Sequence, residues 1–197
     1  MRLGSIGPLV LTSLAIMGSP GPATISLVAA SSVYGVQRSM PYLVGIILGT
    51  TIVLLAVAAG ITAALLAVPA IGSIVIAISV VYILWLAYHI ATASPLSESF
   101  ARHAPSFGGG ALLGVANPKA WVAIAAVFAS AHLASAATTD AAAKVGVLTG
   151  MIIVINATWL IAGRSLAPLL RDPRRARVLY VSLAVALILA TALAVLH

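Results

Sequence analysis

The chain has 197 residues, of which 62% are apolar and only 7% are charged. Because a soluble domain carries roughly a quarter charged residues, this composition excludes a water-facing surface and predicts a membrane protein. The net charge is +7, but five of the ten basic residues lie between Arg164 and Arg177, where arginines beside a membrane span set its orientation. The expected partner is therefore a lipid bilayer and no nucleic acid.

Six apolar segments can be drawn in chain order: residues 5–33, 41–66, 69–92, 108–136, 144–167 and 177–196. Lipid offers no hydrogen bonds to an open backbone, and these runs are too long for barrel strands, so all six are expected to be helices. The sequence predicts an all-α polytopic membrane protein with a single transmembrane domain over residues 1–197.

The first segment contains Ser19-Pro20-Gly21-Pro22. Proline lacks an amide donor and pushes the preceding residue out of the α region, so the helix is expected to break here. Residues from Ala23 onward would begin a half-helix whose free amides could hold a carboxylate, and carbonyls from Ile16 to Gly18 could hold a cation. The alternatives are a plain kink, or a signal peptide that covers this segment.

The fourth segment contains a second break, Asn117-Pro118-Lys119. A lysine at the membrane centre costs roughly 2.5–3.5 kcal/mol, so Lys119 is expected to have a partner, a water cavity or a function. The alternative is that its side chain reaches an interface. Asn117 is expected to cap the following half-helix, with ligand binding as the alternative. Two interrupted segments in matching halves are the best sequence indication of a transporter's binding site.

Thr50 and Asn156 lie near the middle of the second and fifth segments. Hydrogen bonds between membrane helices average only about 0.6 kcal/mol, so helix packing is the default role and substrate contact the alternative. The acids Glu98, Asp140 and Asp172 all fall in predicted loops. There is no cysteine, no paired carboxylate and no clustered set of metal ligands, so we expect neither an enzyme nor a cofactor or metal.

The two halves share an order of features. Gly45 and Gly49 in the second segment correspond to Gly146 and Gly150 in the fifth, each pair following a proline break. This order favours two inverted three-helix repeats, about 1–92 and 108–197, joined by a loop at 93–107. The alternative is two independent helix-packing motifs.

Basic residues in the loops predict the orientation. With six crossings, one side holds seven arginines and the other holds only Arg2 and Lys144. The arginine-rich side is expected to be cytoplasmic, which places both termini outside.

At these motifs the chain resembles the lysine exporter (LysE/RhtB-type) family of small amino-acid exporters. The resemblance rests on Ser19-Pro20-Gly21-Pro22, on Gly45 to Gly49, on Trp85-Leu86-Ala87-Tyr88, and on Gly114 to Ala120 with its Asn-Pro-Lys box. It implies a bacterial inner-membrane carrier, a homodimer, that exports amino acids or similar small metabolites at the expense of the proton gradient. Many members carry an acid where this chain has Thr50, so its coupling or its substrate is expected to differ.

The leading hypothesis is a secondary exporter that alternates access between the two repeats. Its small-molecule substrate would contact Ser19, Pro20, Gly21, Pro22, Thr50, Asn117, Pro118, Lys119 and Asn156. The substrate carboxylate would lie near Lys119 and the half-helix starts. The alternatives are a non-transporting accessory or assembly subunit, and a membrane enzyme that acts on lipids.

Overall fold

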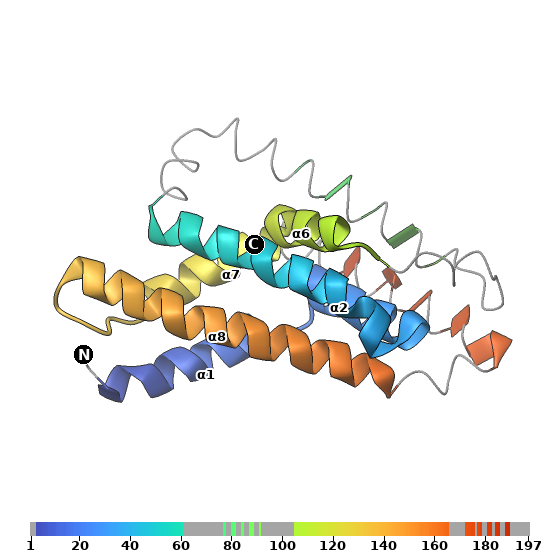
Figure 1. The fold of residues 1–197 in the computed structure, drawn as a ribbon, viewed down its shortest axis with the longest axis horizontal. Helices are drawn as coiled ribbons and strands as arrows, with labels where there is room; N and C mark the ends of the chain where they lie inside the picture. Colours follow the sequence, from blue (N-terminus) through green and yellow to red (C-terminus); the bar gives the residue numbers. More distant parts are fainter. Residues whose placement is uncertain are drawn as a thin grey trace.

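A computed structural model describes residues 3–60 and 105–165 continuously, with individual residues between 77 and 91 and between 172 and 189. The predicted segments 69–92 and 177–196 and the loop 93–107 therefore lie largely outside the described residues. After a short 3-10 turn at Leu3–Ser5, the described helices are α1 (Ile6–Ile16), α2 (Pro22–Ala58), α6 (Phe107–Ala116), α7 (Pro118–Ala129) and α8 (Ala137–Arg164). Every described element is helical, which confirms the predicted class (Figure 1).

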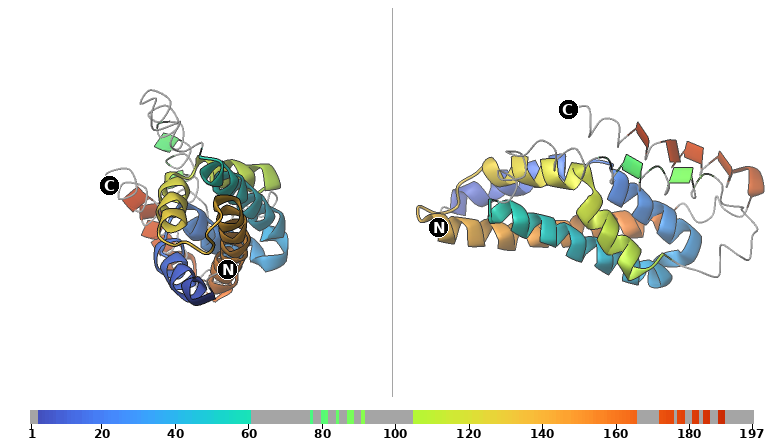
Figure 2. Two further views of the ribbon diagram at one scale, coloured as in Figure 1. Left: turned by 90° about the vertical axis from the view of Figure 1, so that its left-hand side faces the viewer. Right: turned by 90° about the horizontal axis from the view of Figure 1, so that it is seen from above.

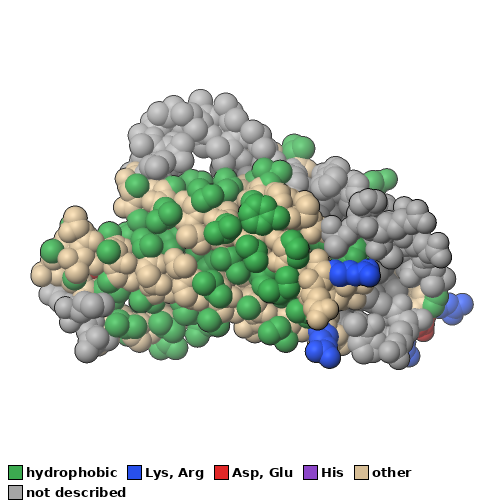
Figure 3. All heavy atoms as spheres, in the orientation of Figure 1, with side chains coloured by type: hydrophobic (Ala, Val, Ile, Leu, Met, Phe, Trp, Pro, Cys, Tyr) green, Lys and Arg blue, Asp and Glu red, His purple; other side chains and the backbone are tan. Residues whose placement is uncertain are grey.

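The described helices are suited to a membrane. Two of them, α2 and α8, are long and apolar enough to cross one, and α6 with α7 would add a third span if this bent pair counts as one. Large apolar side chains are exposed along the long helices, and green surface covers much of the face in Figure 3. They include Leu48, Ile52, Leu55, Val154 and Ile161. Such a surface is stable against lipid and not against water.

Both predicted breaks are present. The helix α1 ends at Ile16 and α2 begins at Pro22, while α6 and α7 meet at Asn117 with a bend of 58°. Pro22 and Pro118 each occupy the first helical position, where the missing amide has no intrahelical partner to lose. The prolines thus end one helix and start the next.

The boundary that we predicted between residues 33 and 41 is present at Gly35, but the predicted gap there is too long. The helix α2 continues from Pro22 to Ala58 and leaves helical geometry only at Gly35, where φ is 79°. Residues 36–40 contain neither glycine nor proline, so the chain turns at Gly35 and resumes its helix at once. We refer below to residues 22–34 and 36–58 as the first and second parts of α2. The helix also ends before residue 66, because Gly60 takes φ 75°.

The predicted start of the fifth segment is also wrong. The helix α8 begins at Ala137, so Asp140 lies in its first turn and not in a loop. Asp140 pairs with Lys144 one turn later at 2.8 Å, and it accepts hydrogen bonds from the amides of Leu133 and Ala134. A carboxylate near a helix N-terminus with a lysine four residues on is a favourable start that hydropathy alone does not reveal.

Close backbone contact joins the second part of α2 to α6. A Cβ added at Gly45 would lie 2.1 Å from the Phe107 carbonyl oxygen, and one at Gly49 would lie 2.3 Å from that of Ala111. Gly110 of α6 faces the carbonyl of Tyr42 just as closely. Glycines on both helices therefore let the backbones touch.

The glycine pair of α8 does not repeat this packing. No described atom lies within 4 Å of a Cβ added at Gly146 or Gly150. Instead, α8 approaches the first part of α2 at Gly163, where a Cβ would lie 2.6 Å from the Val28 carbonyl oxygen. The correspondence between the two pairs in the sequence does not extend to their packing.

One apolar side chain anchors α1 to the bundle, while Leu11, Leu14 and Ile16 of the same helix are exposed. Leu9 is fully buried in one cluster with Ile124 of α7 and Ile152 of α8. Figures 1 and 2 show α1, the second part of α2 and α8 running along the length of the molecule, with α6 tilted across them. The two breaks consequently meet inside this bundle.

The α2–α6 contact gives a matched pair of variants. We expect Gly49→Ala to lower the melting temperature of the purified protein, because the new methyl group would force the two backbones apart. Gly150→Ala should leave it unchanged or raise it, since alanine is favoured over glycine in a helix by about 0.5–1 kcal/mol. Equal effects of the two substitutions would contradict the described contact.

The Asp140–Lys144 pair gives a second prediction. Asp140→Asn should lower the melting temperature, because it leaves the buried ammonium of Lys144 without its counter-charge. The double variant Asp140→Asn/Lys144→Met should recover most of the loss, since it removes the unpaired charge. Heating followed by size-exclusion chromatography measures both, and a double variant no better than the single one would refute the pairing argument.

Candidate functional site

The first break exposes carbonyl oxygens that side chains cover. The hydroxyl of Ser19 donates to the Ile16 carbonyl at 2.8 Å, and the indole N–H of Trp159 donates to the Gly18 carbonyl at 3.1 Å. These partners occupy the carbonyls that we expected to hold a cation. The cation that the structure itself contains at this break lies instead on oxygens of Ser19 and Pro20.

A lysine from the second break supplies that cation. The ammonium of Lys119 donates to the carbonyl and the hydroxyl of Ser19, the latter at 2.7 Å, and to the carbonyl of Pro20 at 3.1 Å. These residues are about one hundred positions apart in the chain. Lys119 has the partner that its position demanded, and it ties the two breaks together.

Gly21 makes room for this lysine. Its backbone is extended, with φ −163° and ψ 179°, a conformation that any residue adopts. A Cβ at this position would lie 2.6 Å from Cδ of Lys119. A side chain at Gly21 would therefore push the Lys119 stem out of its present position, while the backbone itself would tolerate it.

Nearby residues satisfy backbone hydrogen-bonding groups at the second break. The side-chain oxygen of Asn117 accepts from the Lys119 amide at 3.2 Å, so Asn117 caps α7 as expected. The indole of Trp121 donates to the carbonyl of Val115 at 2.8 Å, which covers an acceptor freed at the end of α6. A tryptophan therefore serves each break, Trp159 at the first and Trp121 at the second.

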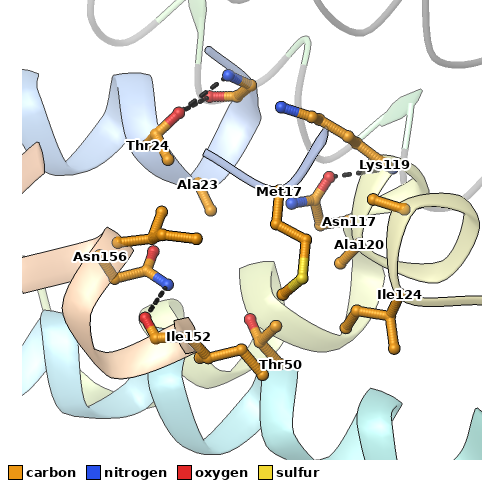
Figure 4. Close-up of a pocket in the computed structure, with 13 residues that line it drawn as sticks. Met17, Ala23, Thr24, Thr50, Asn117, Lys119, Ala120, Ile124, Ile152 and Asn156 are labelled. Atoms are coloured by element: carbon orange, nitrogen blue, oxygen red, sulfur yellow. Dashed lines mark hydrogen bonds between the residues drawn. The ribbon is translucent and has the colours of Figure 1, made fainter. Parts of the chain in front are cut away.

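A cavity of about 50 Å³ lies between the breaks (Figure 4). Its lining includes five residues singled out in the sequence: Gly21, Thr50, Asn117, Lys119 and Asn156. The other lining residues are Met17, Ala23, Thr24, Ala120, Ala123, Ile124, Ile152 and Ile155. The remaining predicted site residues are not in the lining: Ser19 and Pro20 hold Lys119, and Pro22 and Pro118 are buried at the helix starts.

Asn156, which lines this cavity, has an unused acceptor. Its side chain is buried, and its amide nitrogen donates to the Ile152 carbonyl at 2.8 Å. Its side-chain oxygen is fully buried and has no hydrogen-bond partner. A buried acceptor without a donor is unfavourable by about 1–3 kcal/mol, so this oxygen is suited to a ligand that carries an N–H or O–H group.

Two helix starts also meet at the cavity. Ala23 and Thr24 in the first turn of α2 line it, as do Lys119 and Ala120 in the first turn of α7. At α7 the Lys119 and Ala120 amides already donate to Asn117, so free first-turn amides are available only at α2. The dipoles of both helices still place partial positive charge at the cavity. The cavity can therefore accommodate an anionic group such as a carboxylate.

Several lining residues escaped the sequence analysis. Ile152 and Ile155 share one helical face with Asn156, which was predicted, so the periodicity around this polar residue could have identified them. Met17 and Thr24 carry no comparable pattern. Their place in the cavity lining follows only from the helix break between Met17 and Thr24.

The charge inventory of the cavity is simple. Lys119 is the only titratable residue among the described residues that line it, and the described acids Asp140 and Asp172 are not part of that lining. Among the described residues, no group of three or more histidines, cysteines or acids could hold a metal ion. Any solute bound here would meet one cation, helix starts and neutral side chains.

A helical membrane protein with a polar cavity between two broken helices has the architecture of a solute carrier. Residues 14–197 match the model of the LysE type translocator family, and the chain belongs to this family. The family is one of translocators and not of enzymes, as the motifs indicated.

Two curated relatives carry the name cysteine/O-acetylserine efflux protein. They come from Salmonella choleraesuis (strain SC-B67) and Salmonella typhimurium (strain LT2), and each is 39% identical to this chain over 88 residues. The matched region covers 44% of this chain and 44% of each relative. No solved structure gives a significant match.

The Gly21–Lys119 contact gives a third prediction. Gly21→Ala should destabilise the protein by about 1–3 kcal/mol, as overpacking of a filled site does. In a Lys119→Ala background the same substitution should have almost no effect, because the stem that it strikes is gone. A double-mutant cycle of unfolding free energies measures this coupling, and additive effects would contradict the contact.

Proposed function

We propose that this protein is a secondary active exporter of amino acids or related small metabolites across the bacterial inner membrane. The solute binds in the cavity between the two broken helices, and the proton gradient drives its export. The observation that carries the proposal is the cavity itself. Two helix starts, one lysine and one unpaired acceptor converge there from both halves of the chain.

These groups suit a zwitterion. A carboxylate at the cavity would be stabilised by the first turn of α2, where Ala23 and Thr24 lie, and by the positive charge of Lys119. A donor group on the solute would satisfy the oxygen of Asn156. Both charges of an amino acid would then have partners at the cavity.

The lining favours a small neutral side chain. Ala120, Ala123, Ile124, Ile152 and Ile155 form its apolar part. No described acid lines the cavity to hold a second cationic group, so a basic amino acid is disfavoured. The name of the relatives, cysteine/O-acetylserine efflux protein, agrees with a solute of this kind.

The distribution of basic residues supports an orientation of the protein in the membrane. Gly163 contacts Val28 near the turn of α2, so Arg164 and Arg38 belong to the same end of the molecule. Asp140 and Lys144 lie at the opposite end of α8. We assign the arginine-rich end to the cytoplasm, with both termini outside and six crossings in total.

Alternating access would move the two halves, which we take to be inverted repeats, against each other around the cavity. The acid that many family members carry is Thr50 here, so Lys119 is the group that we assign to coupling. A homodimer remains part of the proposal, as the family resemblance implies.

Counterflow in proteoliposomes tests this function. The protein should exchange radiolabelled L-serine, L-alanine or O-acetyl-L-serine, and exchange of L-lysine should be at least tenfold slower. A pH gradient that drives protons inward should stimulate movement of the solute in the opposite direction.

Lys119→Ala should reduce this counterflow at least tenfold, while His132→Ala, a change at an exposed loop residue, should leave it unchanged. Correctly inserted protein that exchanges no solute of the panel would contradict the proposal and favour an accessory subunit. Unchanged exchange by Lys119→Ala would overturn the role of this lysine.

A further inference from the structure

The ammonium of Lys119 is fully engaged in this structure. An ammonium has three N–H donors, and three oxygens accept from it: the carbonyl and hydroxyl of Ser19 and the carbonyl of Pro20. It has no donor left for a solute carboxylate. The carboxylate role proposed above therefore requires Lys119 to leave these oxygens first.

Two of the three oxygens, the carbonyls of Ser19 and Pro20, depend on this cation for a hydrogen-bond donor. The neighbouring carbonyls of Ile16 and Gly18 are satisfied by Ser19 and Trp159, and that of Gly21 accepts from the Thr24 hydroxyl at 3.0 Å. Neither the Ser19 carbonyl nor the Pro20 carbonyl has another hydrogen-bond donor among the described residues, because the break removes the helical donors that would have faced them. The oxygens thus form a site whose occupant is an ammonium.

We infer that the oxygens of Ser19 and Pro20 are a primary-ammonium site that Lys119 occupies when no solute is bound, and that the amino group of the transported zwitterion takes over. The inference rests on the proposed function and deepens it. When the solute ammonium displaces Lys119, the freed lysine meets the solute carboxylate. Each charge exchanges one partner for another, so no buried charge is left uncompensated at the end of the exchange.

This exchange of partners would make the site selective for zwitterions. A simple amine can displace Lys119 but leaves the lysine without a counter-charge, and a simple acid offers no ammonium to the vacated oxygens. Only a molecule with both groups completes the exchange. Because Lys119 ties α7 to the break before α2, its release also loosens the contact between the two halves.

Chemical rescue of Lys119→Ala tests the site without any transport. The substitution removes three carbons and the ammonium, the atoms of propylammonium. We expect propylammonium to raise the melting temperature of Lys119→Ala by about 2–4 °C at concentrations well above its Kd, and to leave the wild-type protein unchanged. L-Serinamide, an amino-acid ammonium without a carboxylate, should also raise it.

Matched compounds and a matched variant control for non-specific effects. Propanol, tetramethylammonium and lactate lack a primary ammonium and should not stabilise Lys119→Ala. Lys119→Met fills the space of the stem, so propylammonium should not stabilise it. If Lys119→Ala is too unstable to purify alone, the same comparison is read from the yield of monodisperse protein prepared with each compound.

Stabilisation or improved yield restricted to primary ammonium compounds and to Lys119→Ala supports the inference. Equal effects of propylammonium and propanol, or no effect of any compound, would overturn it. The readout needs no transported solute, so absence of counterflow would refute the proposed function and leave this result standing. Failure of rescue with active counterflow would refute only the ammonium site.

Discussion

A proline break in a membrane helix frees carbonyl groups that lipid cannot hydrogen-bond, and the protein must supply their partners. Here the partners of the first break come from the second half of the chain. Lys119 donates to Ser19 and Pro20, and Trp159 donates to Gly18. The local conformation of residues 17–21 therefore depends on the packing of α7 and α8. Any movement between the halves must break or exchange these hydrogen bonds.

This dependence positions the cavity. The close approach of the second part of α2 to α6 holds the second break against the bundle, and Gly163 lets α8 contact the first part of α2. Both helix starts then lie at one place beside Asn156. A site formed by the N-termini of two helices and one neutral side chain needs few charged residues. That is consistent with a chain in which only 7% of residues are charged.

The sequence allowed prediction of features that local sterics decide. Proline fixes where α1 and α6 end, and Asn117 has the chemistry of a cap, so both breaks and the cap were predicted correctly. Hydropathy located the boundary near Gly35 but overestimated the gap there. It failed at Asp140, where one ion pair accompanies the start of the helix. The partner of Lys119 and the role of Trp159 could not be predicted, because they join positions about one hundred or more residues apart.

The central claim is that solute binds in the cavity between the breaks, and substrate protection of introduced cysteines tests it most directly. The chain has no cysteine of its own, so single variants can be labelled with N-ethylmaleimide. The account predicts that an amino acid active in counterflow slows labelling of Thr50→Cys and Ile155→Cys at least twofold, and leaves His132→Cys in the exposed loop unaffected. Equal labelling rates with and without that solute at both cavity positions would contradict it.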